Sequence, residues 1–347
     1  MKPESEPNME VEWGKRRKQE YGGYLPLEIG CGQEWFHGLE RNIRRYNCGR
    51  TAIYEAAQAI KADVKKICIP YYICQTVVDA IEQAGIEVKR YSLNENLEPA
   101  EEIRVDGGTG VLVVNYFGLK DGFIKEISQK YAHMILDCTQ AFFFDPVMRV
   151  GVSNIYSCRK FIGVPEGAYL IGQDTSAEQL EEGSAWESYS FLCKAHELGT
   201  NRAYKDSLEN EKRLGAHKEG MSPLTRRFLQ GVDYHFIAKR RKENFKKLHE
   251  LLGGMNRFDV QRWGGTPQCY PLWLSKNAGR QLKEKLLKKS IYIPTLWKEC
   301  RELCGKNSLE AEWSSNLLCI PTDQRYSPWD MEFLSVTILK AMEEIKQ

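Results

Sequence analysis

The sequence lacks a long hydrophobic run, and it lacks a surplus of charge of either sign. No apolar stretch approaches the ~20 residues that a helix needs to cross a bilayer. The N-terminal segment is polar and charged where a secretory signal would be apolar. The 49 Lys and Arg residues against 47 Asp and Glu leave a net charge of +2, which gives no long-range field for nucleic acid or an anionic membrane. These absences predict a cytoplasmic protein that binds neither membrane nor nucleic acid.

Two further patterns are missing: the dense cysteine spacing of a disulfide scaffold and the glycine fingerprint of a dinucleotide site. The 11 cysteines are odd in number and scattered, many inside apolar runs, which favours buried reduced thiols. Cys300 and Cys304 could share a helix face, but no second Cys or His pair lies nearby, so we predict no metal site. No Gly-x-Gly-x-x-Gly follows the first predicted strand, which argues against nucleotide binding in a Rossmann-type fold. Basic clusters such as Lys239–Arg241 are typical of a solvated helix face.

The composition is that of a globular protein. Of the 347 residues, 42% are apolar and 28% are charged. This length favours a large domain with a smaller one appended. We expect a loose arm over residues 1–20, a large domain over 21–235 and a small domain over 236–347. Helical spacing and short apolar strands alternate from about residue 47 to 172, which predicts parallel strands joined by crossover helices. The large domain is therefore expected to be an α/β sheet covered on both faces.

The second half of the chain has a different pattern. Residues 176–220 are rich in Glu, Lys and Ser, which predicts surface helices and loops. Apolar residues at three- and four-residue steps over 221–254 predict one or two long helices leading into the small domain. There we expect a small sheet formed by residues 269–274, 291–297 and 316–321, with helices at 278–289 and 328–346.

Four local features lie at the ends of the predicted strands, where open α/β sheets bind their ligands. The first is Gly49-Arg50-Thr51 at the start of a helix, where glycine lets the backbone approach an anion and free N–H groups point at it. Thr51 could instead serve only as an ordinary helix cap. The second is Asn115-Tyr116-Phe117-Gly118, whose aromatic rings could wall a planar ligand or simply pack in the core.

The third feature is Asp137, near the C-terminal end of an apolar strand. Burying a carboxylate costs several kcal/mol unless a cation or a strong donor meets it. Asp137 therefore needs a partner such as a lysine, an arginine or a protonated ring nitrogen, and a structural ion pair is equally consistent. Gln140, three residues later, could reach the same site.

The fourth feature is Lys160, in a turn that also contains Gly163, Pro165 and Gly167. A lysine held between buried strands can be desolvated, which lowers its pKa and makes it a competent imine-forming nucleophile. The alternative is a lysine whose ammonium extends into solvent.

The order of these features resembles the fold-type-I pyridoxal-phosphate enzymes of the DegT/DnrJ/EryC1/StrS group, from about residue 47 to the C-terminus. CGRTAIYEA is similar to the phosphate-binding helix start of that group, ILDCTQAF to its Asp-x-x-Gln signature, and SCRKFIGVPEGAYL to its lysine loop. VVNYFG and IPTDQRYSPWDM resemble further family motifs. The resemblance implies an aspartate-aminotransferase-like large domain with a mostly parallel sheet and a smaller α+β C-terminal domain.

The resemblance also implies roles for particular residues. Lys160 would bind pyridoxal 5'-phosphate covalently and move the proton between substrate and cofactor. Asp137 would keep the pyridine nitrogen protonated, and Gln140 would lie near the phenolic oxygen of the ring. The phosphate would be bound by Gly49, Arg50, Thr51 and Ser157.

The chain departs from the family pattern at several positions. The ring-stacking aromatic of the family corresponds to Cys74 here, so Tyr72 or Tyr71 would stack instead. Asn115 stands where many members have His. Asn201 and Arg202 are the candidates for the Asn and Arg that members supply from the neighbouring subunit of a homodimer.

The resemblance implies an aminotransferase that passes an amino group from glutamate or glutamine to a keto-sugar or similar carbonyl compound, in cell-envelope or polysaccharide synthesis. A homologue that binds the cofactor without turnover is the first alternative. A sugar dehydratase that uses the aminated cofactor is the second, and Lys160 argues against it because such dehydratases carry His at that position.

Overall fold

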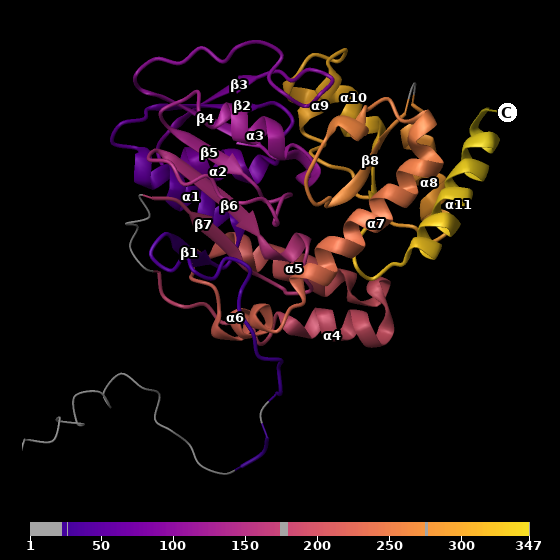
Figure 1. Ribbon diagram of the computed structural model, residues 1–347, viewed down its shortest axis with the longest axis horizontal. Coiled ribbons are helices and arrows are strands. Elements are labelled where there is room, and N and C mark those ends of the chain that lie inside the picture. The colour runs from indigo at the N-terminus through magenta and orange to yellow at the C-terminus, as the bar shows by residue number, and fades with distance from the viewer. Residues whose placement is uncertain (1–22, 26, 174–179, 275–276, 347) are drawn as a thin grey trace, which may run out of the picture.

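The computed structural model describes residues 23–25, 27–173, 180–274 and 277–346, as a twisted sheet with helices around it and a smaller C-terminal unit beside it (Figure 1). The arm expected at residues 1–20 lies outside the described residues. The strands are β1 Ile43–Tyr46, β2 Lys66–Pro70, β3 Glu87–Tyr91, β4 Thr109–Val114, β5 Met134–Asp137, β6 Val152–Ser157, β7 Ala168–Ile171, β8 Cys269–Trp273 and β9 Leu317–Pro321.

The helices alternate with the strands in the first half of the chain and dominate the second half. The α-helices are α1 Gly49–Ile60, α2 Gln75–Gln83, α3 Asp121–Ile127, α4 Tyr189–Leu198, α5 Thr200–Ala216, α6 Pro223–Gln230, α7 Tyr234–Leu252, α8 Ala278–Lys288, α9 Cys300–Leu303, α10 Leu309–Asn316 and α11 Pro328–Lys346. Short 3₁₀ turns cover Tyr116–Gly118, Cys158–Lys160, Gly253–Met255 and Val260–Arg262.

The large sheet has the order β1-β7-β6-β5-β4-β2-β3. The pairs from β3 across to β6 are parallel, whereas β7 runs antiparallel to both β6 and β1. The expected mostly parallel sheet is therefore confirmed. The analysis of the sequence assigned no strand to β1, because its four residues include Arg44 and Arg45 and carry no apolar run.

Small side chains hold α1 close to the sheet. Thr51, Ala52, Ile53, Ala56 and Ala57 are its buried residues, so a narrow helix face packs against the strands. The long helices expected over 221–254 are two, α6 and α7. Each begins at a side-chain cap, because Ser222 accepts from the Thr225 N–H and Asp233 from the Phe236 N–H.

The small domain contains a two-stranded antiparallel sheet of β8 and β9, with α8 and α11 close to the positions expected. The third strand predicted at 291–297 is wrong, because this segment forms no strand. Pro294 has no N–H to donate to a ladder, and Trp297 adopts a positive φ of 45°. The apolar side chains of this segment pack on the core as a loop instead, with the Trp297 ring centroid 4.5 Å from that of Tyr72.

All 11 cysteines are free, and most of them are buried, as their apolar surroundings in the sequence predict. Across the residues that the structure describes, no helix combines the length and the apolar character needed to span a membrane. The same residues contain no cluster of His, Cys, Asp and Glu side chains suited to a metal ion.

Candidate active site

The carboxyl ends of β4, β5 and β6 meet at one edge of the sheet. The register pairs Val114 with Asp137 and Asp137 with Ile155, so Asp137 ends the middle strand of the three. β6 ends at Ser157, and Lys160 follows in a single 3₁₀ turn. Parallel pairing therefore brings Asp137 and Lys160 to the same edge, although 23 residues separate them in the sequence.

A threonine that the sequence analysis did not single out joins these two residues. Lys160 Nζ donates to Thr139 Oγ1 at 2.8 Å, and the Thr139 N–H donates to Asp137 Oδ1 at 2.9 Å. Thr139 lies between Asp137 and Gln140 in the Asp-x-x-Gln motif, so its position in that motif was the available signal. The hydroxyl orients the lysine nitrogen toward the acid.

The electrostatic environment of Lys160 lowers its pKa. Removal of the ammonium from water is the main cause, and the negative charge of Asp137 opposes it. The side chain keeps accessible area because it lines a cavity of about 620 Å³. By accessible area Lys160 is an exposed residue, although its Nζ atom is hydrogen-bonded to Thr139. Asp137 is only 4% exposed.

The N-terminus of α1 begins against the same threonine. A Cβ added at Gly49 would lie 3.4 Å from Thr139 Cγ2, an ordinary van der Waals distance, so the start of α1 and Thr139 are neighbours. The side chain of the cap residue Cys48 contacts the Thr51 hydroxyl at 3.4 Å but accepts from none of the first N–H groups of α1, which therefore have no side-chain cap. Thr51 Oγ1 donates to Asn47 Oδ1 at 2.7 Å and braces the turn before the helix. This helix end is a positive dipole terminus suited to an anion.

Two arginines beside this terminus converge on one carboxylate. Arg50 Nη2 and Arg159 Nη2 each lie 3.0 Å from Glu211 Oε1, and Arg159 Nη1 binds the second oxygen, Oε2. Arg50 was a predicted phosphate ligand, whereas Arg159 and Glu211 were not identified from the sequence. Glu211 lies on α5 and is 52 residues from Arg159, so only the folded chain reveals the contact.

The predicted amide residues lie at the same edge but bind the backbone. Gln140 Oε1 accepts from the Phe117 N–H at 2.9 Å. Asn115 Nδ2 donates to Asp121 Oδ1 at 2.8 Å, and Asn115 Oδ1 accepts from the Lys120 N–H at 2.9 Å. Both amides are buried and brace the turn after β4.

The candidates for ring stacking lie in different surroundings. Tyr72 is fully buried among Tyr116 and Trp297, and its carbonyl accepts from Tyr116 Oη at 2.6 Å. Tyr71 is half-buried and lies under the Arg90 guanidinium. Cys74 is half-buried, and its Sγ lies 3.1 Å from Thr76 Oγ1.

The remaining predicted residues are also located. Ser157 is buried at the end of β6. Asn201 and Arg202 are exposed in the first turn of α5.

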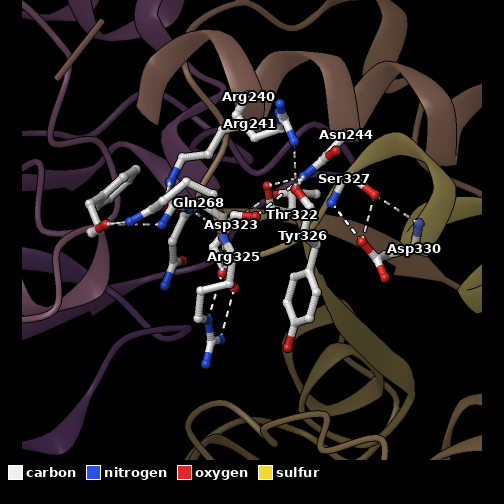
Figure 2. Close-up of polar contacts among 12 residues, drawn as sticks. Arg240, Arg241, Asn244, Gln268, Thr322, Asp323, Arg325, Tyr326, Ser327 and Asp330 are labelled. Atoms are coloured by element: carbon white, nitrogen blue, oxygen red, sulfur yellow. Dashed lines mark hydrogen bonds and ion pairs between the residues drawn. The ribbon is translucent and has the colours of Figure 1, made fainter. Parts of the chain in front are cut away.

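The small domain closes one side of the lysine cavity with the motif that begins at Asp323. Gln324 and Arg325 line the cavity together with Lys160 and His196. Asp323 holds the Arg325 guanidinium in a bidentate pair, with Nε–Oδ1 at 2.7 Å and Nη2–Oδ2 at 3.0 Å (Figure 2). The wall of the cavity therefore includes the Asp323–Arg325 ion pair.

A buried arginine of α7 fastens this motif to the lysine loop. Arg241 Nε donates to Gln324 Oε1 at 3.2 Å, and Gln324 Nε2 donates to the Phe161 carbonyl at 2.8 Å. Arg241 also donates to the Gln268 carbonyl at 3.0 Å. Burial lowers the pKa of Arg241 to about 10. The loop after Lys160 and the small domain are therefore held together by hydrogen bonds.

These groups fit a cofactor that carries an aldehyde, a basic ring nitrogen and a phosphate. Lys160 supplies an amine of lowered pKa, and Asp137 supplies a buried carboxylate that accepts from a backbone N–H. The α1 terminus and two guanidiniums supply the positive charge that a phosphate needs.

Comparison with known proteins identifies the fold. No family model and no curated protein matches the sequence. Among solved structures, an aminotransferase (TlmJ) from Streptoalloteichus hindustanus is 14% identical, with a TM-score of 0.61 over 88% of this chain and 86% of that one. A putative sugar aminotransferase from Streptococcus pneumoniae, in its PMP form, is 11% identical, with a TM-score of 0.61 over 87% and 88%.

A third structure carries the family name. It is a DegT DnrJ EryC1 StrS aminotransferase from Brucella abortus, 14% identical, with a TM-score of 0.55 over 86% of this chain and 85% of that one. The fold is that of the sugar aminotransferases. This confirms the fold-type-I architecture expected from the sequence motifs. In this aminotransferase fold the likeness extends over both the large sheet and the small domain.

Proposed function

We propose that the protein is a pyridoxal-phosphate-dependent aminotransferase. It transfers an amino group from glutamate or glutamine to a keto-sugar or a similar carbonyl compound. The observation that carries the proposal is the arrangement of Lys160, Thr139 and Asp137 beside the N-terminus of α1. This cofactor requires an amine of lowered pKa, a buried acid and an anion site. All three lie at the carboxyl ends of neighbouring strands here.

The cofactor supplies an electron-accepting ring that can carry an amino group between two substrates. Lys160 holds and moves the proton at its Nζ atom, since its lowered pKa favours the neutral amine more than in water. Thr139 Oγ1 orients that nitrogen. Asp137, at the carboxyl end of β5, stabilises a proton on a ring nitrogen placed against its carboxylate.

The proposed cofactor residues fall into two groups. Lys160, Asp137, Gly49 and Arg50 lie where they can meet the cofactor directly, and Cys74 is proposed from its place in the family pattern. Asn115, Gln140, Thr51 and Tyr72 are buried and bonded within the fold, so they shape the site. Ser157 is proposed as a phosphate ligand from its position at the end of β6.

The cavity beside Lys160 supports a polar substrate of sugar size. Its volume of about 620 Å³ falls in the range of small-molecule sites, and its wall includes Arg325, Gln324 and His196. Arg325 can meet a substrate carboxylate, and the amide and imidazole can bind hydroxyls. Structures of similar fold include the Helicobacter pylori aminotransferase PseC, involved in the biosynthesis of pseudoaminic acid.

Assembly and cellular setting complete the proposal. We propose a cytoplasmic homodimer that acts in cell-envelope or polysaccharide synthesis. Large apolar side chains remain exposed on and before the α4–α5 hairpin, namely Trp186, Leu198 and Tyr204, which supports an interface there.

The proposal is tested by adding pyridoxal 5'-phosphate to the purified protein. We expect absorbance to develop near ~410–430 nm, and borohydride reduction to fix a pyridoxyl group on Lys160 in peptide mass mapping. Lys160→Ala should show neither, whereas Lys89→Ala, at an exposed lysine of β3, should behave as wild type. An unlabelled Lys160 in the wild-type protein would refute the proposal.

Turnover separates the enzyme from a homologue that only binds the cofactor. Glutamate added to the loaded protein should release 2-oxoglutarate, and a panel of keto-sugars should then sustain that release. A protein labelled on Lys160 that releases no keto acid from any amino donor would be the non-catalytic homologue.

A further inference from the structure

Helix α5 covers the anion site with a carboxylate of its own. We propose that Glu211 competes with the cofactor phosphate for Arg50 and Arg159, so that α5 acts as a latch that phosphate must displace. This inference rests on the proposed function, because it concerns the cofactor held by Lys160.

The first support is the contact itself. Glu211 accepts from both guanidiniums, and its backbone carbonyl also accepts from Arg50 Nη2, at 3.2 Å. Burial tends to raise the pKa of Glu211, but hydrogen bonding and charge from Arg159 outweigh it and lower the pKa overall. Glu211 is therefore ionised at neutral pH and binds the two cations as an anion would.

The second support is independent of the Glu211 side chain. The carbonyl of Leu214, near the end of α5, accepts from Cys48 Sγ at 3.5 Å, and the His217 carbonyl accepts from Asn47 Nδ2 at 2.8 Å. Asn47 and Cys48 immediately precede α1. The C-terminal end of α5 thus lies against the two residues that lead into α1.

The charges of the site favour one anion over two. Arg50, Arg159 and Lys160 are cations and Asp137 and Glu211 are anions, so the site has one surplus positive charge. A phosphate dianion would leave a net negative charge if Glu211 stayed, and a neutral site if Glu211 withdrew. Glu211 and phosphate are therefore expected to exclude each other.

The α4–α5 hairpin lies at the surface of the single chain. α4 buries none of its residues, and Gly199 joins the two helices with a φ of 88°. A cavity of about 390 Å³ separates the hairpin from the lysine loop, with Leu208 and Glu211 on one wall and Lys160 and Gly163 on the other. A shift of α5 away from Arg159 would also break the hydrogen bond from Asn210 Nδ2 to the Pro165 carbonyl, at 3.0 Å.

The test compares pyridoxal 5'-phosphate with pyridoxal, which lacks the phosphate. In Glu211→Gln we expect the Kd for pyridoxal 5'-phosphate to fall about tenfold, because the neutral amide competes weakly for two guanidiniums. The Kd for pyridoxal should stay within about twofold of the wild-type value, since that ligand needs no anion site. Both constants are read from absorbance titration and from borohydride labelling of Lys160. Glu209→Gln, at an exposed position of the same helix, is the matched control.

A second measurement needs no variant. Binding of pyridoxal 5'-phosphate should increase hydrogen–deuterium exchange in α5, and pyridoxal should not. Unchanged or weaker binding of the phosphate form by Glu211→Gln, or exchange in α5 that stays unchanged, would overturn the latch and make Glu211 a support for the arginines. Pyridoxal labelling of Lys160 would still uphold the cofactor site in that case, whereas no labelling by either ligand would refute the proposed function itself.

Discussion

The carboxylates in and around the lysine loop have different partners, and they divide by burial into an inner and an outer pair. On the inner side, Asp137 and Glu166 accept hydrogen bonds from backbone N–H and hydroxyl groups and are almost fully buried. On the outer side, Glu211 and Asp323 bind arginine guanidiniums and keep part of their surface in solvent.

This difference indicates what each side can accept. Asp137 accepts from a backbone N–H instead of pairing with a guanidinium, so a buried cation such as a protonated ring nitrogen would stabilise its carboxylate. An outer carboxylate already neutralises its arginine, so an incoming anion must compete with it. The buried carboxylate of Asp137 can therefore bind a cationic group of a ligand. An anionic group must compete with Glu211 for the arginines.

The largest expected effect comes from the inner acid. Asp137→Asn should reduce turnover by about 10³-fold, the loss typical of removing one preorganised electrostatic group. The amide can still accept from the Thr139 N–H, so the thermal midpoint should change little. Steady-state kinetics with glutamate and thermal denaturation check the two parts. Turnover within a few fold of wild type would remove Asp137 from the mechanism.

The second inner carboxylate should affect stability instead. Burial raises the pKa of Glu166 to about 7, against 4.5 in the unfolded chain. A raised carboxyl pKa means that the folded state loses stability as pH increases from about 4.5 to 7, with the full cost present above 7. Glu166→Gln should therefore be more stable than wild type by up to about 3 kcal/mol at pH 8, and no more stable at pH 4.

Urea denaturation at the two pH values measures this difference. Glu181→Gln, at an exposed position, should be neutral at both. A stabilisation of Glu166→Gln that is equal at pH 4 and pH 8 would show that the charge of Glu166 is not its cause.

The smallest effect is expected on the outer side. Asp323→Asn removes a bidentate partner of Arg325, but the arginine side chain is 67% exposed, so solvent replaces most of the interaction. We expect the free energy of unfolding to fall by about 1 kcal/mol or less. If Asp323→Asn lowered the free energy of unfolding by about 3 kcal/mol, the distinction between the inner and outer carboxylates would be wrong.

Much of the fold could be predicted from local patterns in the sequence. The apolar runs before Pro70, Val114 and Asp137 predicted β2, β4 and β5, because a strand buried on both faces needs uninterrupted apolar residues. The apolar run at 291–297 predicted a strand for the same reason, and this was wrong because Pro294 and Trp297 prevent pairing. The strand β1 was missed because two of its four residues are arginines.

For the site, the sequence placed Lys160 and Asp137 at the ends of neighbouring strands, and the structure brings them to one edge. It did not single out Thr139, whose hydroxyl matters only because the chain turns back toward β6. The buried amides of Asn115 and Gln140 looked like cofactor ligands, yet backbone N–H groups of the adjacent turn bind them. A side chain's partner depends on which backbone groups lack one, and local patterns do not show this.

The sequence alone determined the kind of protein: an α/β sheet with a lysine, an acid and a glycine-led helix at strand ends, since these depend on residues close along the chain. Only the tertiary structure decided that Glu211 lies between Arg50 and Arg159, and that Arg241 fastens the small domain to the lysine loop. These contacts join polar residues far apart in sequence. No hydrophobic periodicity marks such pairs, because their positions follow from how whole helices pack.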